Sequence, residues 1–252
     1  MNANYLFVKH EMHYFSKKNK SNMPNKLDLL LREKTDPIYE TMVEKLENKG
    51  WNFEKNPYYV LTFHAQIGAL YKKGGIAFYG RATNGWDDDY NDGINSILTH
   101  SHSRFFQMIK RIANSVYQEN QVDNIVWSNI CKVAPEQGNP DDVLWEDQYN
   151  YIVKILNAEM EVLRPSITVL ITGIEENKRW DSPLFKVFEK LEFVKCYQNE
   201  KLGIECSVEI YYNQQSKQYF LITGRPDSFD VTREFMDFQA NHIIDFIKSK
   251  LG

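Results

Sequence analysis

Residues 166–173 read SITVLITG, a continuous apolar run that follows Pro165 and ends at a glycine. A short run of this kind, rich in β-branched residues and bounded by turn residues, predicts a strand that is buried on both faces. Strands this uniformly apolar are typical of a parallel sheet that helices cover on both sides. Three further runs have the same character: GGIAFYG at 74–80, NIVWSNI at 124–130 and KQYFLITG at 217–224.

The segments between these runs carry apolar residues at helical spacing, over about 94–117, 145–163 and 184–191. Alternation of strands and helices predicts βαβ units, and hence a three-layer α/β/α sandwich around a mainly parallel four-stranded sheet. The run SVEIYY at 207–212 precedes the last strand by the four residues NQQS, which predicts a hairpin at the margin of the sheet.

The N-terminal part has a different pattern. Apolar residues recur at helical spacing from Asn25, a stop falls at 48–50, and a second helical stretch is expected over about 57–71. We therefore divide the chain into a helical extension, 1–73, packed on an α/β domain, 74–252. The extension is expected to support packing, with a lid, a DNA contact or an oligomer contact as alternatives; the protein is expected to be a monomer.

Composition narrows the class of protein. Of 252 residues, 42% are hydrophobic and 14% aromatic, which excludes a disordered or fibrous chain. The formal net charge of -4 gives no global field for a polyanion, although a local basic face would suffice for DNA. No apolar run reaches the roughly 20 residues that span a bilayer, and the N-terminus lacks a signal-peptide pattern, so we expect a cytoplasmic protein without a membrane partner. The 3 cysteines fit neither a disulfide framework nor a zinc site.

The loops that follow the four strands are unusually polar. They contain Arg, Asn, Lys, Trp and carboxylates, and their sequences are GRATNGWDDD at 80–89, NICKVAPEQGNP at 129–140, TGIEEN at 172–177 and GRPDSFD at 224–230. Because ligands of open α/β sheets bind beyond the carboxyl ends of the strands, we expect these loops to meet in one site.

These segments resemble the uracil-DNA glycosylase superfamily over about residues 74–248. GRATNGW at 80–86 is similar to the family's first loop, which carries the catalytic water and the gate at the pyrimidine 5-position. The family's base-reading Asn, in some branches followed by N-x-x-K-x-x-P and a later Asn, has counterparts here in Asn129, Lys132, Pro135 and Asn139. LRPSITVLITG at 163–173 resembles the next unit, and the family's last His-Pro-Ser corresponds to Arg225, Pro226, Asp227 and Ser228.

The chain also departs from the family pattern. Ala82 stands where several branches have Asp or Asn, Arg225 replaces the His, and Asn84 stands at the gate that a Tyr closes in the uracil-specific branch. The resemblance thus implies a pocket open to larger 5-substituents. The iron-sulfur branches use four cysteines, so we expect no iron-sulfur cluster in a chain with 3 cysteines. We also expect no other cofactor and no metal ion.

The resemblance implies roles for individual residues at the base. Asn129 would read a pyrimidine edge, because an amide offers both donors and an acceptor; a turn cap is the structural alternative. Gly80 and Arg81 would line the base, and Trp86 would be its aromatic platform. Phe105 and Phe106 are alternative platforms for which a core role is expected.

Other roles concern charge and the DNA backbone. Arg225 would face the pyrimidine O2 as charge develops there, or clamp a phosphate, or pair with Asp227. Asn84 and Asp87 are the candidates for orienting water, the carboxylates of Asp88 and Asp89 being expected in solvent. Three residues are expected to contact DNA phosphates: Lys132, Ser228 and Arg104.

The leading hypothesis is a monofunctional DNA glycosylase that flips a 5-modified pyrimidine and leaves an abasic site. Glucosylated hydroxymethylcytosine in phage DNA is the substrate that best fits the altered loop, which suggests antiviral defence. Two alternatives stay open. One is a non-catalytic DNA-binding or nucleotide-binding module of the same fold, and the other is an α/β enzyme acting on free nucleosides or nucleotides.

Overall fold

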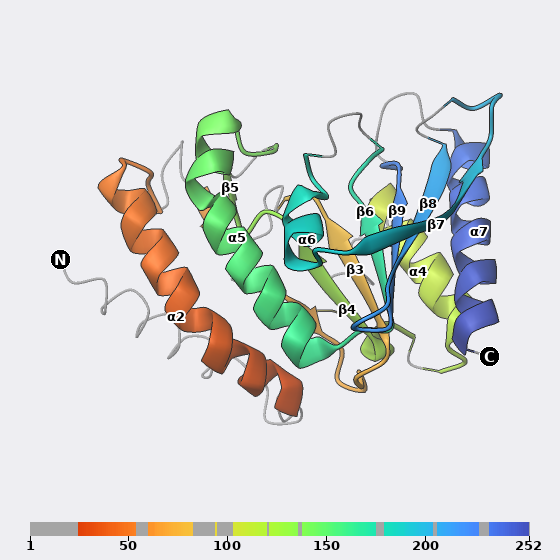
Figure 1. Cartoon of the computed structure of the whole chain (residues 1–252), viewed down its shortest axis with the longest axis horizontal. Helices are drawn as coiled ribbons and strands as arrows, with labels where there is room; N and C mark the ends of the chain where they lie inside the picture. Colours follow the sequence, from red (N-terminus) through yellow and green to blue (C-terminus); the bar gives the residue numbers. More distant parts are fainter. Residues whose placement is uncertain are drawn as a thin grey trace.

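The computed structural model describes residues 25–53, 60–82, 94, 103–119, 121–135, 138–174, 179–203, 206–226 and 232–251. Its main element is a seven-stranded mixed sheet (Figure 1). In spatial order the strands are β2 (Gln66–Ile67), β4 (Ile125–Asn129), β3 (Ile76–Gly80), β6 (Ile167–Ile171), β9 (Gln218–Thr223), β8 (Ser207–Asn213) and β7 (Leu191–Gln198).

The four strands expected from the apolar runs form the middle of this sheet. β4, β3, β6 and β9 are neighbours in that order, and every adjacent pair among them is parallel. Almost all of their residues are buried, as expected for strands covered on both faces. Because the four run in the same direction, their carboxyl ends, and the loops that follow, lie along one edge.

The α/β class is thus confirmed, but the sheet is larger than the expected four strands and is mixed. The predicted hairpin is present: β8 pairs antiparallel with β9. β7 then pairs antiparallel with β8 at the outer margin, where half or more of its residues are exposed. Residue 191 was expected to end a helix, whereas it begins β7. The helix α6 covers only Ser182–Val187.

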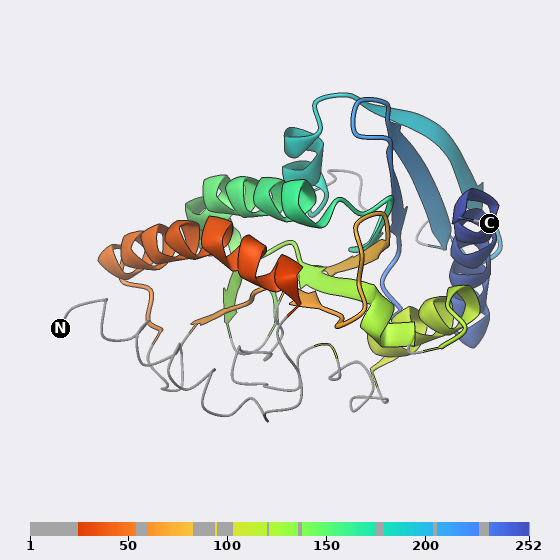
Figure 2. The same ribbon diagram turned by 90° about the horizontal axis from the view of Figure 1, so that it is seen from below.

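Helices cover both faces of the sheet, giving three layers (Figure 2). α4 (Arg104–Val116) and α7 (Arg233–Leu251) pack on one face, together with Ile76 and Phe78 of β3. α5 (Asp142–Leu163) and α6 pack on the other, together with Ala77 and Tyr79 of the same strand. The alternation of strand side chains therefore divides the core into two layers.

The N-terminal region is only partly helical. α2 (Lys26–Asn48) begins as expected and packs along α5. The helix expected over 57–71 is wrong: β1 (Val60–Thr62) pairs with β5 (Val133–Pro135), and β2 pairs with β4. The physical reason is a period of two, since Leu61, Phe63 and Ala65 alternate with polar residues and are buried.

Among the helices of the described ranges, none combines the length and the apolar character that a membrane span requires.

Candidate functional site

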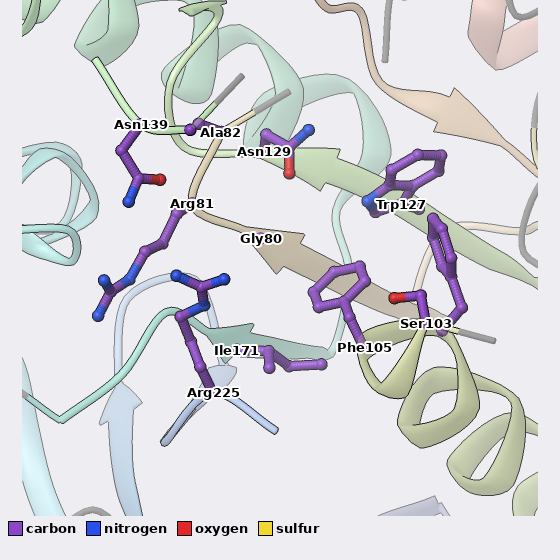
Figure 3. A pocket seen from close by; sticks show the side chains of 12 residues that line it. Gly80, Arg81, Ala82, Ser103, Phe105, Trp127, Asn129, Asn139, Ile171 and Arg225 are labelled. Carbon is purple, nitrogen blue, oxygen red and sulfur yellow. The ribbon is translucent and has the colours of Figure 1, made fainter. Parts of the chain in front are cut away.

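A cavity of about 130 Å³ lies at the carboxyl edge of the parallel strands (Figure 3). An apolar cavity of about 150 Å³ admits benzene, so this one has the size of a single six-membered ring. Its lining comes from the ends of all four parallel strands and from the start of α4: Gly80, Arg81, Ala82, Ser103, Phe105, Phe106, Trp127, Asn129, Gly138, Asn139, Ile171 and Arg225. The expected meeting of the strand-end loops is thus observed for described residues of three loops, which are Gly80, Arg81 and Ala82, then Asn129, Gly138 and Asn139, and then Arg225.

Asn129 is the most enclosed polar side chain of the lining. It is 2% exposed, and its Nδ2 has no hydrogen-bond partner in the part of the chain that the structure describes. Its backbone is fixed, since Gly80 is its partner in the β3–β4 ladder and the amide of Ile130 donates to the Gly80 carbonyl at 2.9 Å. A buried amide left with an unused donor is costly. The other end of the amide, Oδ1, lies 2.6 Å from the position that a Cβ atom on Gly80 would occupy.

The opposite wall is aromatic. Phe105 is half-buried, and its ring atoms lie 3.2 and 3.3 Å from the position that a Cβ atom on Gly80 would occupy. Phe106 packs edge-on against Trp127, with 4.9 Å between the ring centroids. Phe106 is 2% exposed and belongs to the core, and Phe105 packs against the same core, as expected; both side chains also line the cavity. Trp86, the expected platform, lies outside the described residues.

Arg225 contributes a positive charge to the cavity. Its side chain is half-buried and points toward the end of β3 (Figure 3), and it makes no ion pair or hydrogen bond with the residues that the structure describes. The alternative of a surface ion pair with Asp227 concerns a residue outside the described ranges. No carboxylate occurs among the described lining residues, so the cavity as described is positively charged.

Arg81 also lines the cavity, but it is held by its neighbours. Its Nε donates to the carbonyl of Thr172, and its guanidinium carbon lies 5.0 Å from the centroid of the Trp180 ring. Arg81 was expected to line the base, and that role stays a prediction.

Lys132 does not contact DNA, and this expectation is wrong. The side chain is completely buried on the opposite face of the sheet, with Nζ 2.6 Å from the Glu159 carboxylate and 2.9 Å from the Ser128 hydroxyl. The Tyr79 hydroxyl donates to the other Glu159 oxygen at 2.9 Å. Burial lowers the pKa of the Lys132 ammonium, and the Glu159 carboxylate opposes that shift. The pair therefore braces the ends of β3 and β4 beneath Gly80 and Asn129.

The remaining expected residues divide into two groups. Arg104 is exposed in the first turn of α4, and its guanidinium donates to the Pro226 carbonyl at 3.4 Å, so it lies beside the loop that carries Arg225. Asn84, Asp87 and Ser228 lie outside the described residues.

Several lining residues were not assigned to the base site from the sequence. Trp127 lies two positions before Asn129 in β4, and side chains two positions apart in a strand lie on the same face of the sheet. This spacing could have predicted that Trp127 lines the same cavity as Asn129. No sequence pattern predicted that Ser103 and Ile171 would line the cavity. Asn139, the later Asn that follows the N-x-x-K-x-x-P segment, does line the cavity.

The described residues contain no group of three His, Cys, Asp or Glu side chains placed to hold a metal ion. Comparison of the chain with models of known protein families and with curated proteins gave no match.

Proposed function

We propose that the protein is a DNA glycosylase of the uracil-DNA glycosylase type, which hydrolyses the N-glycosidic bond of a flipped, 5-modified pyrimidine. One observation carries the proposal: Asn129 ends β4 and Arg225 follows β9, nearly 100 positions later, yet both line one cavity of single-ring size. A nucleobase is a planar ring with donors and acceptors on its edge, which matches an amide facing an aromatic wall.

The chemistry needs a positive charge at the base. When the bond between the sugar C1′ and the base nitrogen breaks, its electron pair leaves with the base, and water supplies a hydroxyl to C1′ and a proton to the base. A guanidinium in the cavity wall stabilises the negative charge that develops on the departing base. Arg225 supplies such a group, and Asn129 would hold the pyrimidine edge while the bond breaks.

Small residues favour a base with a substituent. Gly80 and Ala82 contribute at most a methyl group to the lining, so no bulky side chain closes the cavity at these positions. A substituent as large as glucose exceeds a cavity of this size and would have to extend from its mouth. The candidate substrate that the resemblance suggests is glucosylated hydroxymethylcytosine of phage DNA, and antiviral defence is the role that this substrate implies.

A second candidate is a binding module of the same fold that has lost catalysis. The observation in its favour is that the described lining residues offer no carboxylate to orient water, and that Ala82 occupies the position of the family's Asp or Asn. Such a module would bind the extruded base and leave the glycosidic bond intact.

A panel of oligonucleotides with differently 5-substituted cytosines and uracils separates these functions. The purified protein is incubated with each, and abasic sites are revealed by alkaline cleavage. Excision of at least one pyrimidine by the wild type, lost in Asn129→Ala and retained in the matched surface variant Asn241→Ala, supports the glycosylase. A shift of DNA in a gel without cleavage of any member of the panel contradicts it and favours the module.

A further inference from the structure

A buried polar cluster lies directly behind the cavity, on the other face of the sheet. Tyr79 and Ser128 are partners in the β3–β4 ladder, one rung before Gly80 and Asn129, which line the cavity (Figure 3). Because successive side chains of a strand point to opposite faces, the side chains of Tyr79 and Ser128 point away from the cavity, toward α5. There a single carboxylate, that of Glu159 on α5, binds both hydroxyl groups.

The Glu159 carboxylate joins the two strands at this rung. Its Oε2 accepts a hydrogen bond from the Tyr79 hydroxyl at 2.9 Å, and its Oε1 accepts one from the Ser128 hydroxyl at 3.2 Å. The Lys132 ammonium, three residues beyond Asn129, donates to Oε1 at 2.6 Å and to the Ser128 hydroxyl at 2.9 Å. The cluster therefore holds the chain both before and after Asn129.

A second buried side chain of α5 holds the same segment. The Gln148 amide oxygen accepts hydrogen bonds from the backbone N–H groups of Lys132 and Val133 at 3.2 and 3.0 Å. Its Nε2 donates to the Val133 carbonyl at 2.7 Å. Gln148 and Glu159 lie about three helical turns apart on α5, so both project from one face of the helix. This face of α5 thus binds the segment that follows Asn129 at two points.

Stability alone does not explain why charges are buried here. Lys132 is 0% and Glu159 1% exposed, and the cost of taking both charges out of water offsets much of their attraction. Apolar side chains of similar volume are often at least as stabilising at such positions. They lack direction, however, whereas hydrogen bonds fix the distance and the angle between the groups that they join. A buried polar cluster is therefore suited to holding the geometry of a neighbouring site.

We propose that Glu159, together with Lys132, is a positioning residue that holds the Asn129 amide in the one orientation that meets the base. The inference rests on the proposed function, in which Asn129 contacts the pyrimidine edge. Neither Glu159 nor Lys132 is among the described residues that line the cavity, so both act through the backbone of β4. Such an effect can be large, because a displacement of about 1 Å at a substrate-positioning group can lower a rate about 100-fold.

Two double variants of the full chain separate positioning from stability. Lys132→Met/Glu159→Met, the buried double variant, replaces both charges with apolar side chains. Lys34→Met/Glu161→Met, the exposed control, removes an ion pair between α2 and α5 that has the same 2.6 Å separation of nitrogen and oxygen. Exposed pairs contribute little to stability. Both are measured at a temperature at which urea denaturation shows them to be folded.

The first readout is the side-chain amide of Asn129 in the NMR spectrum of isotope-labelled protein, identified by its absence from Asn129→Ala. We expect a single pair of amide proton signals in the wild type and in the exposed control. The buried double variant should give broadened or multiple signals, because the end of β4 then samples more than one position. A single sharp pair in that variant would overturn the proposal. If that variant does not fold, Ser128→Ala, which deletes one oxygen of the cluster, takes its place with the same two outcomes.

The second readout is kcat/KM for the oligonucleotide from which the wild type excises a base. We expect a loss of at least about tenfold in the buried double variant and of less than about twofold in the exposed control. Lys132→Met/Glu159→Gln keeps an amide that can bind the hydroxyl groups of Tyr79 and Ser128, so it should recover much of the loss. An equal loss with Met and with Gln at position 159 would contradict a positioning role.

The two readouts also distinguish this inference from the proposed function. Full activity of the buried double variant would refute the positioning role alone. A perturbed Asn129 amide in that variant, together with a wild type that excises no base, would refute the glycosylase alone.

Discussion

Gly80 and Asn129 are partners at the last rung of the parallel ladder between β3 and β4, and a Cβ atom on Gly80 would lie 2.6 Å from the Asn129 Oδ1. The same Cβ would lie 3.2 Å from the ring of Phe105. The missing side chain at position 80 thus creates the space between the amide and the aromatic wall.

Gly80→Ala should therefore reduce ligand binding more than it reduces stability. Its methyl group meets side-chain atoms, which can shift, and it would occupy the space meant for the base. We expect the affinity for deoxynucleoside monophosphates to fall by at least about tenfold, which corresponds to roughly 1.4 kcal/mol. Thermal melting of Gly80→Ala and Gly80→Ala/Asn129→Ala provides the control, since removing the Asn129 amide relieves the clash. An affinity within twofold of wild type would show that the cavity does not bind the ligand.

Replacing Lys132 should lower the free energy of unfolding. Lys132→Met leaves the Glu159 carboxylate buried without its cation, and breaking a buried pair in this way costs about 3–5 kcal/mol. In Lys132→Met/Glu159→Met both charges are gone, so most of the loss should be recovered. The free energy of unfolding in urea at pH 7 measures both effects. A loss below about 1 kcal/mol in the single variant would be incompatible with a buried ion pair.

The three thiols should differ in reactivity. Cys196 is exposed on β7, whereas Cys131 and Cys206 are buried. Burial raises the pKa of the Cys131 thiol well above its usual range and that of Cys206 to about 11, so few thiolates form at pH 8. Iodoacetamide labelling of the folded protein, read by mass spectrometry, should modify Cys196 first. Early labelling of Cys131, next to the loop that follows Asn129, would contradict the packing described.

Arg104 should contribute to DNA affinity without sequence preference. It is exposed beside the Arg225 loop, so it is placed to meet a backbone phosphate. Arg104→Gln should weaken binding to all duplexes alike and reduce the slope of log affinity against log salt by about 0.9. An unchanged salt slope, measured by fluorescence anisotropy, would remove Arg104 from the interface.

The central strands could be predicted from the sequence because strands buried on both faces are apolar throughout. The loops that follow parallel strands meet at the carboxyl edge of a sheet, so the sequence also predicts that Asn129 and Arg225 lie in one site. β7 gave a weak signal, because an edge strand exposes much of its surface and its side chains need not be apolar. The segment around Leu61 and Phe63 was predicted to be helical because a short apolar run is compatible with both a helix and a strand. Only the alternation of apolar and polar residues identifies it as a strand.

Lys132 shows why the side-chain environment was harder to predict. A lysine three residues after Asn129 suggests a phosphate contact, since lysines are rarely fully buried. Its burial depends on Glu159, 27 positions later on α5, and no local pattern reveals that pairing. Phe105 packs against the core as expected, but helical spacing shows which side chains face the sheet and not which of them also border a cavity.

Abasic-site formation in phage DNA that carries glucosylated hydroxymethylcytosine tests the central claim most directly. DNA of the same phage without the modification is the matched substrate, and Asn129→Ala is the matched protein. We predict abasic sites in the modified DNA with wild-type protein, few in the unmodified DNA, and none with the variant. Modified DNA left intact by a protein that cleaves a plain uracil oligonucleotide would contradict the proposed substrate, and inactivity on both would contradict the glycosylase.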